Sequence, residues 1–181
     1  MAKSLNPWNN IPKHKNSIPI PFEGNENFRF ISNSLYLPRG LGRSYGDVCL
    51  NENGNLIITT QYNSLIEFNS QTGHLKCESG ISINEILNVI VPQGWFLPVV
   101  PGTSYVSVGG AIANDIHGKN HHKFGTFGNS IIEIELLRSN GEVLKCSEKE
   151  NYEFFKATIG GLGLTGLILS ATIKLIKVES Q

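Results

Sequence analysis

The stretch PRGLGRSYGD, residues 38–47, follows a short apolar run and combines three glycines with two arginines. Glycines let successive backbone N–H groups point into one concavity, which suits phosphate oxygens. Arg39 and Arg43 can add positive charge, and Ser44 can add a hydroxyl donor. The stretch contains no GK[ST] sequence and opens no long amphipathic helix, so it is neither a Walker A loop nor a Rossmann fingerprint. By local pattern alone, a plain glycine-rich turn and an anion site both remain open.

A second glycine-rich stretch, GGAIANDIHGKNHHKFGTFG (109–128), follows the stiff turn PGT at 101–103. Ser107 can cap a short helix whose first amides include Gly109 and Gly110. The small residues at the start of this helix would let a planar or phosphorylated ligand approach the backbone closely. Two such loops in one chain favour a long dinucleotide over a single phosphate.

The histidines of this second stretch also suggest a metal site. His117 and His121 have the i, i+4 spacing of a helical zinc pair, but Gly118 and Asn120 weaken a helix there. No cysteine or glutamate lies nearby in the sequence. We therefore place a metal below a dinucleotide-site or structural role and expect none. The second pair, His121 and His122, is interpreted as loop histidines that bond local carbonyls.

Length, composition and charge describe an ordinary soluble protein of 181 residues, 40% of them hydrophobic. The 15 basic and 15 acidic side chains cancel, so no nucleic-acid partner is expected. The three scattered cysteines form no CxxC pair and are interpreted as buried side chains in a reducing compartment. Because the N-terminus lacks the apolar core of a signal peptide, we expect a cytoplasmic protein. The sequence also lacks the GxSxG elbow of a serine hydrolase.

The first half of the chain is predicted to mix strands with one clear helix. Residues 1–34 are interpreted as an irregular lead-in with room for one short strand, and strands are expected at 35–37 and 56–60. A hairpin is expected around a turn at 70–73, and an extended segment at 95–100. Ser82 and Glu85 form a capping box for a helix that ends at Pro92 and Gly94. Its apolar face would contain Ile83, Ile86, Leu87, Ile90 and Val91.

The second half is predicted as a hairpin, a short helix and a final long strand. The hairpin spans 131–146, with Asn140-Gly141 as a type I′ turn. Ser147 and Glu150 form a second capping box before a helix through Tyr152 and Phe155. The order of elements indicates an α+β fold rather than a regular βαβ alternation.

Taken together, five stretches resemble the FAD-binding domain of the vanillyl-alcohol oxidase (PCMH-type) family, over about residues 35–178. They are PRGLGRSYGD, PGT, VGGAIANDIHGKNHH, GTFGN and ATIGGLGLTGLI. Within that family they are most similar to the branch that oxidises decaprenylphosphoryl-β-D-ribose at the 2′ hydroxyl. The resemblance implies a domain over 35–181 built of two α+β lobes. One lobe would hold a small mixed or parallel sheet, and the other a larger sheet with antiparallel strands and flanking helices.

The resemblance also implies an FAD site, with residues 39–47 as the first pyrophosphate loop. His117 would face the reactive side of the flavin as the catalytic candidate, and Ile168 would meet the adenine. Relatives that tether FAD use a histidine in the first loop, where this chain has Arg43-Ser44-Tyr45, so noncovalent FAD is expected. The implied cofactor-binding residues are Arg39, Gly40, Leu41, Gly42, Arg43, Ser44, Tyr45, Gly46, Asp47, Pro101, Gly102, Thr103, Ser107, Val108, Gly109, Gly110, Asn114, Ile116, His117, Gly118 and Ile168.

The implied reaction is hydride transfer from a secondary sugar hydroxyl to flavin N5, the first half of an epimerisation. An NAD(P)H-dependent reductase partner would complete it, and a polyprenylphosphoryl-sugar substrate would bring the whole protein to the inner face of the membrane. Family members continue into a substrate domain with a catalytic lysine, so the 181 residues are expected to be an incomplete catalytic unit. Two alternatives remain: a sugar-alcohol or aldonolactone oxidase of the same fold, and a noncatalytic FAD- or nucleotide-binding module.

Overall fold

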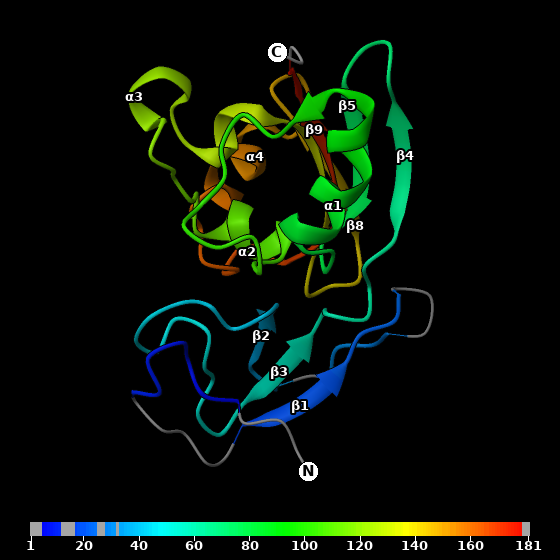
Figure 1. The fold of residues 1–181 in the computed structure, drawn as a ribbon. Coiled ribbons are helices and arrows are strands. Elements are labelled where there is room, and N and C mark those ends of the chain that lie inside the picture. Colours follow the sequence, from blue (N-terminus) through cyan, green and yellow to red (C-terminus); the bar gives the residue numbers. More distant parts are fainter. Residues whose placement is uncertain (1–4, 12–16, 25–27, 32, 179–181) are drawn as a thin grey trace.

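The computed structural model describes residues 5–11, 17–24, 28–31 and 33–178. The chain forms two lobes (Figure 1), of which the lower one contains strands β1, β2 and β3. The remaining strands and the helices form the upper lobe. This is the α+β architecture expected from the sequence, with a small parallel sheet and a larger antiparallel one.

The small sheet has the strand order β1-β3-β2. Its centre is β3 (Asn55–Ile58), which pairs in parallel with β1 (Ile18–Pro21) and with β2 (Tyr36–Arg39). Leu56 and Ile57 are buried, as an apolar run in a central parallel strand requires. The strands predicted at 35–37 and 56–60 are thus present with shifts of one or two residues. The segment expected as an irregular lead-in contributes β1 to this sheet.

The large sheet is antiparallel, in the order β4-β5-β9-β7-β8. The predicted hairpin is formed by β4 (Leu65–Asn69) and β5 (His74–Glu78), and the Asn69 side chain accepts the amides of Gln71 and Thr72 in its turn. The central strand is β9 (Leu167–Lys174). Four further strands complete the fold: β7 (Ile131–Leu137), β8 (Val143–Ser147), and the short pair β6 (Trp95–Phe96) and β10 (Ile176–Lys177).

Helix α1 (Ile83–Ile90) forms as predicted, with the Ser82–Glu85 capping box at its start. Its buried face contains Ile83, Ile86 and Ile90, but Val91 is 47% exposed. The placement of Val91 on that face is wrong because the tighter helix η1 (Val91–Gln93) begins there and rotates the side chain outward. The other helices are α2 (Val108–Ala113), α3 (His121–Phe124), η2 (Phe127–Ser130) and α4 (Tyr152–Thr158).

The turn between β7 and β8 differs from the predicted type I′ turn. Arg138 N donates to Glu142 O, and Gly141 N donates to Arg138 O, so the loop contains three residues. Gly141 has a φ of 86°, whereas Asn140 is not among the residues with positive φ. A type I′ turn needs positive φ at both central residues, and a three-residue loop needs it only at the last. The predicted hairpin is correct, and its turn type is wrong.

The second predicted capping box is also wrong. Ser147 ends β8, and its hydroxyl accepts the amides of Lys149 and Glu150, each at 3.2 Å, within the turn that follows the strand. Helix α4 instead begins after Asn151, which has a φ of 48°. Serine hydroxyls satisfy turn amides as well as helix amides, so the same sequence pattern serves both.

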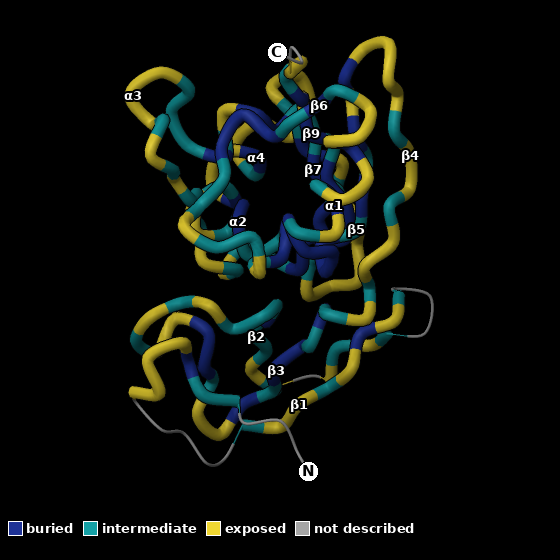
Figure 2. The backbone as a smooth tube through the Cα atoms, in the orientation of Figure 1, coloured by how far each residue is buried: buried dark blue, intermediate teal, exposed yellow. Residues whose placement is uncertain are grey.

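Two clusters of buried apolar side chains stabilise the fold, and Figure 2 shows the buried segments in dark blue. The larger cluster lies between the large sheet and helices α1, α2 and α4. The smaller one joins the lobes, since Phe22 and Ile57 of the small lobe pack with three leucines of the large sheet. Those leucines are Leu137, Leu167 and Leu169.

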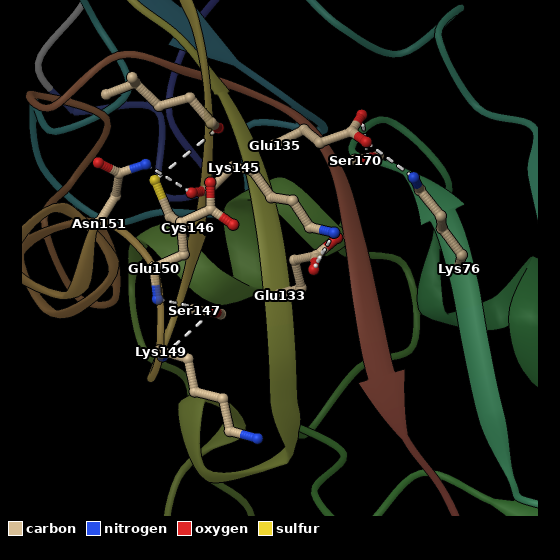
Figure 3. A network of polar contacts seen from close by, with 11 residues as sticks. Lys76, Glu133, Glu135, Lys145, Cys146, Ser147, Lys149, Glu150, Asn151 and Ser170 are labelled. Carbon is tan, nitrogen blue, oxygen red and sulfur yellow. Dashed lines mark hydrogen bonds and ion pairs between the residues drawn. The ribbon is translucent and has the colours of Figure 1, made fainter.

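Part of the large sheet carries a polar network (Figure 3), in which Lys76 Nζ lies 2.8 Å from Glu135 Oε1. Ser170 Oγ, on the strand between them, donates to Glu135 Oε2 at 2.8 Å. Partial burial of Glu135 raises its pKa. The hydrogen bonds from Lys76 and Ser170 and the charges of Lys76 and Lys145 lower the pKa. Together these effects outweigh the effect of burial, so the pKa of Glu135 lies below its ordinary value. Glu133 and Lys145 form a second pair at 2.9 Å.

Candidate functional site

A cavity of about 470 Å³ lies where the two lobes meet, and its size is that of a small-molecule or cofactor site. The small lobe contributes the loop after β2 and Thr59, which follows β3. The large lobe contributes Ser79, the first residues of α2 with those around them, and the glycine-rich turn before β9. The cavity therefore combines the two glycine loops that the sequence suggested for a dinucleotide.

Most of the residues implied to bind a cofactor line this cavity. They are Arg39, Gly40, Leu41, Gly42, Arg43, Ser44, Tyr45, Pro101, Ser107, Gly109, Gly110, Asn114, Ile116, His117 and Ile168. Among the others, Val108 lies in the apolar core, and Gly118 packs directly against the carbonyl of Val100. The remaining four, Gly46, Asp47, Gly102 and Thr103, lie in the same loops but outside the cavity wall.

Twelve further lining residues are not among those implied to bind the cofactor. Seven of them lie within the quoted stretches: Pro38, Ala111, Ala113, Leu162, Gly163, Gly166 and Leu167. The other five, Val48, Cys49, Thr59, Ser79 and Val106, lie outside those stretches. Ser79 and Thr59 reach the cavity because the chain crosses itself there: a side chain at Gly80 would overlap the carbonyl of Thr59. Only glycine allows so close an approach of two backbone segments. The nearest sequence signal for this crossing is ESG at residues 78–80, which begins at the last residue of β5 and is too short to identify a site.

Arg39 shapes the first loop from inside. Its side chain is buried, and its guanidinium donates to the carbonyl of Cys49 at 2.6 Å and to that of Asn6 at 2.8 Å. A side chain at Gly42 would overlap this guanidinium. Arg39 thus holds the loop in its curve and places one buried positive charge at the cavity wall.

The first amides of α2 already have acceptors in the protein. Val108 N donates to Ile81 O at 2.9 Å, and Gly109 N donates to Ser79 O at 2.8 Å. Gly110 N donates to the hydroxyl of the helix cap, Ser107, at 3.3 Å. In this arrangement Gly109 and Gly110 offer the cavity a bare backbone surface rather than free N–H donors.

Arg43 links the two loops at the edge of the cavity. Its Nε donates to Tyr105 O at 3.1 Å, and its guanidinium lies 4.6 Å from the centre of the Trp8 ring. Arg43, Tyr105 and Trp8 are all exposed, so this contact faces solvent. The guanidinium keeps further N–H groups for an anion, because a single Nε bond uses one of five donors.

His117 lines the cavity and is exposed, and its backbone forms an isolated antiparallel bridge with Thr126. The His117 and His121 rings are 6.1 Å apart between their centres. His121 Nδ1 lies 3.2 Å from Gly118 O, so the expected contact of His121 with a local carbonyl is present. The expected loop position is wrong, because His121 and His122 are the first residues of helix α3. In the part of the chain that the structure describes, no three His, Cys, Asp or Glu side chains are grouped to hold a metal ion.

The lining chemistry fits an anionic dinucleotide such as FAD. Two arginines and a histidine line the cavity, and none of the described lining residues is acidic. Ser79 Oγ is buried in the wall with no protein partner, although buried hydroxyls normally have one. The glycines of both loops line the cavity with backbone, and a side chain at Gly40 or Gly109 would overlap Ser107 or Ser79.

Comparison with known proteins agrees with this chemistry. The family model described as FAD binding domain matches residues 32–147. Decaprenylphosphoryl-beta-D-ribose oxidase from Mycolicibacterium smegmatis is 44% identical over 80% of this chain and 32% of its own length. A putative D-arabinono-1,4-lactone oxidase from Neurospora crassa is 29% identical over 78% of this chain and 25% of its own length. L-gulonolactone oxidase from Mus musculus is 27% identical over 76% and 31%, respectively.

The chain thus spans about a third or less of the length of these relatives. Within residues 5–11, 17–24, 28–31 and 33–178, no helix has the length and apolar character needed to cross a membrane.

Proposed function

The chain belongs to the FAD binding domain family, and from that premise we propose that it holds FAD noncovalently between its lobes, as part of an oxidoreductase that acts on a secondary hydroxyl of a sugar. The observation that carries the proposal is the cavity itself. Both glycine loops, two arginines and one histidine meet in it, and none of the described lining residues is acidic.

The residues of the chain have distinct tasks in this proposal. Arg39 holds the first loop in shape, while Arg43 and the Ser44 hydroxyl bind phosphate oxygens. Gly109 and Gly110 allow the cofactor to lie against the backbone of α2. His117, at the exposed side of the cavity, orients the substrate hydroxyl through an imidazole nitrogen. When bound, the flavin supplies a hydride acceptor for a CH–OH carbon.

For the substrate, we propose the 2′ hydroxyl of a polyprenylphosphoryl ribose, oxidised as the first half of an epimerisation. The support is the 44% identity to the mycobacterial relative, whose name states a decaprenylphosphoryl ribose substrate. An NAD(P)H-dependent reductase would then return hydride to the keto sugar. With a lipid-linked substrate, the whole protein would be cytoplasmic and would work at the inner face of the membrane. The alternative, an aldonolactone oxidase, rests on relatives of 29% and 27% identity.

The absorbance spectrum of the purified protein tests the cofactor. We expect a flavin band at about 450 nm, which reflects the electronic structure of the ring. Heat should release the flavin, and its mass should be that of FAD with no peptide attached. A colourless protein that takes up no added FAD would contradict the proposal, and flavin that stays on the denatured chain would contradict the noncovalent part.

Substrate turnover by the whole protein separates the two substrate classes. A polyprenylphosphoryl ribose and an aldonolactone are offered in parallel assays with an artificial electron acceptor. Faster turnover of the ribose substrate supports the proposal, and faster turnover of the lactone supports the alternative.

A further inference from the structure

Ser79 lies in the cavity wall at the junction of three elements. It directly follows β5, its amide donates to Leu169 O of β9 at 2.9 Å, and its carbonyl accepts the amide of Gly109 in α2 at 2.8 Å. Its neighbour Gly80 donates to Tyr62 O at 2.8 Å. These backbone bonds fix the position of the Ser79 main chain. The hydroxyl can therefore reach a hydrogen-bond partner only by rotation about χ1.

The hydroxyl of Ser79 finds none in the protein. Within the described residues, Ser79 Oγ is the one buried side-chain nitrogen or oxygen without a hydrogen-bond partner, in a residue that is 2% exposed. Burial of an unpaired hydroxyl is unfavourable, and such groups in native proteins call for a reason. The other buried serines all have hydroxyl partners: Ser82 with Glu85, Ser107 with Gly110, Ser130 with Phe127 and Ser170 with Glu135.

Because Ser79 lines the cavity, a bound ligand can supply the missing acceptor. The described lining residues include no carboxylate, and the adjacent Gly109 brings no side chain toward the hydroxyl. FAD is rich in acceptors, with phosphate oxygens, ribityl and ribose oxygens, and ring nitrogens. A donor fixed by three backbone elements is also preorganised, since binding a ligand would require no movement of the main chain.

We propose that Ser79 positions the cofactor by donating a hydrogen bond from Oγ to a polar atom of bound FAD. The inference rests on the proposed function, because it requires FAD in this cavity. It adds a residue that neither glycine loop contains and that lies at the end of a different strand. Its role is to fix the dinucleotide, and it takes no part in the chemistry of the substrate.

The test compares FAD affinity with the stability of the flavin-free protein in Ser79→Ala. Titration followed by flavin fluorescence should show a Kd about tenfold higher than that of the unchanged protein, the effect of losing one hydrogen bond. The flavin-free variant should unfold at the same temperature or higher, because the substitution removes an unpaired buried hydroxyl. If Ser79 had only a structural role, Ser79→Ala would keep the Kd for FAD and lower the unfolding temperature.

Ser130→Ala is the matched control. Its hydroxyl is buried like that of Ser79 but donates to Phe127 O at 2.6 Å, away from the cavity lining. We expect Ser130→Ala to unfold at a lower temperature and to keep its FAD affinity.

Three outcomes have separate meanings. If the unchanged protein binds no FAD, the proposed function fails together with this inference. If it binds FAD and Ser79→Ala binds within twofold of it, only the role of Ser79 is overturned. The role is overturned too if Ser79→Ala lowers the unfolding temperature as Ser130→Ala does, since its hydroxyl would then have a partner inside the protein.

Discussion

The Nε of Arg43 donates to the carbonyl oxygen of Tyr105 at 3.1 Å, which joins the loop after β2 to the loop before α2. The guanidinium also stacks over the Trp8 ring at 4.6 Å. At the edge of the cavity, the side chain of Arg43 therefore links two segments of irregular backbone.

Arg43→Ala should weaken FAD binding more than it weakens the fold. The bond to Tyr105 is exposed, so we expect its loss to lower the free energy of unfolding by less than about 1 kcal/mol. The loops would lose both their link and a positive charge, and the Kd for FAD should rise about tenfold. Fluorescence titration measures the Kd, with Lys174→Ala, an exposed cation outside the cavity lining, as the control. An unchanged Kd would show that Arg43 does not serve the ligand.

Arg39→Met, in contrast to Arg43→Ala, should weaken the fold more than it weakens FAD binding. The substitution removes the guanidinium bonds to Cys49 O and Asn6 O and leaves the buried carbonyl of Cys49 without this donor, which should cost about 2–4 kcal/mol of unfolding free energy. Urea denaturation of the flavin-free protein measures this loss. A loss below about 1 kcal/mol would mean that water replaces the guanidinium, and the first loop would then be less dependent on Arg39 than its geometry indicates.

Gly80→Ala should be strongly destabilising, because its Cβ would overlap the backbone carbonyls of Thr59 and Tyr62. We expect a loss of about 3 kcal/mol or more in unfolding free energy, or failure to fold. Gly102→Ala is the matched control, since a Cβ there meets nothing within 4 Å. That variant should stay within about 0.5 kcal/mol of the unchanged protein. Similar stabilities for the two variants would contradict the tight crossing at Gly80.

Glu135→Gln should lower stability at neutral pH but not in acid. The net pKa of Glu135 is lowered in the folded protein, so its contribution is present above the ordinary value of 4.5 and is lost as the pH falls through the folded pKa. Because the pair with Lys76 is partly exposed, we expect a difference of only about 0.5 kcal/mol. Denaturation curves at several pH values measure the difference. A gap that persists well below pH 4.5 would indicate a packing effect instead.

His117→Ala in the whole protein should retain FAD and lose activity. The exposed imidazole is proposed to orient the substrate, so kcat should fall about 100-fold while the FAD content stays the same. His121→Ala, whose ring contacts Gly118 O in the neighbouring loop, should keep kcat within about threefold. Loss of FAD from His117→Ala would show that this histidine holds the cofactor rather than the substrate.

The elements set by local signals could be predicted from the sequence. The Ser82–Glu85 capping box starts α1, and the apolar arms around Asn69 form the first hairpin, because the determinants lie within a few residues. The turn at Asn140-Gly141 could not be typed in this way. Its loop length depends on the register of β7 with β8, which the whole sheet determines.

The site shows the same limit. The glycine loops marked most of the cavity wall, yet Val108 stands between two lining neighbours and is fully buried itself. Helical periodicity explains this, since Val108 shares the core face of α2 with Ile112, four residues on. Ser79 belongs to no motif, and it reaches the wall only through contacts with β9 and α2. A residue placed by such distant partners leaves no trace in its neighbouring sequence.

The apolar cluster between the lobes limits how a cofactor can enter and leave. Phe22 and Ile57 have their packing partners Leu137, Leu167 and Leu169 on the opposite lobe. A hinge that swung the lobes apart would expose these side chains to water, so we expect the cofactor to exchange by fluctuation of the loops at the cavity edge. The lobes should accordingly melt in a single calorimetric transition, and the lifetime of the complex should be governed by loop opening.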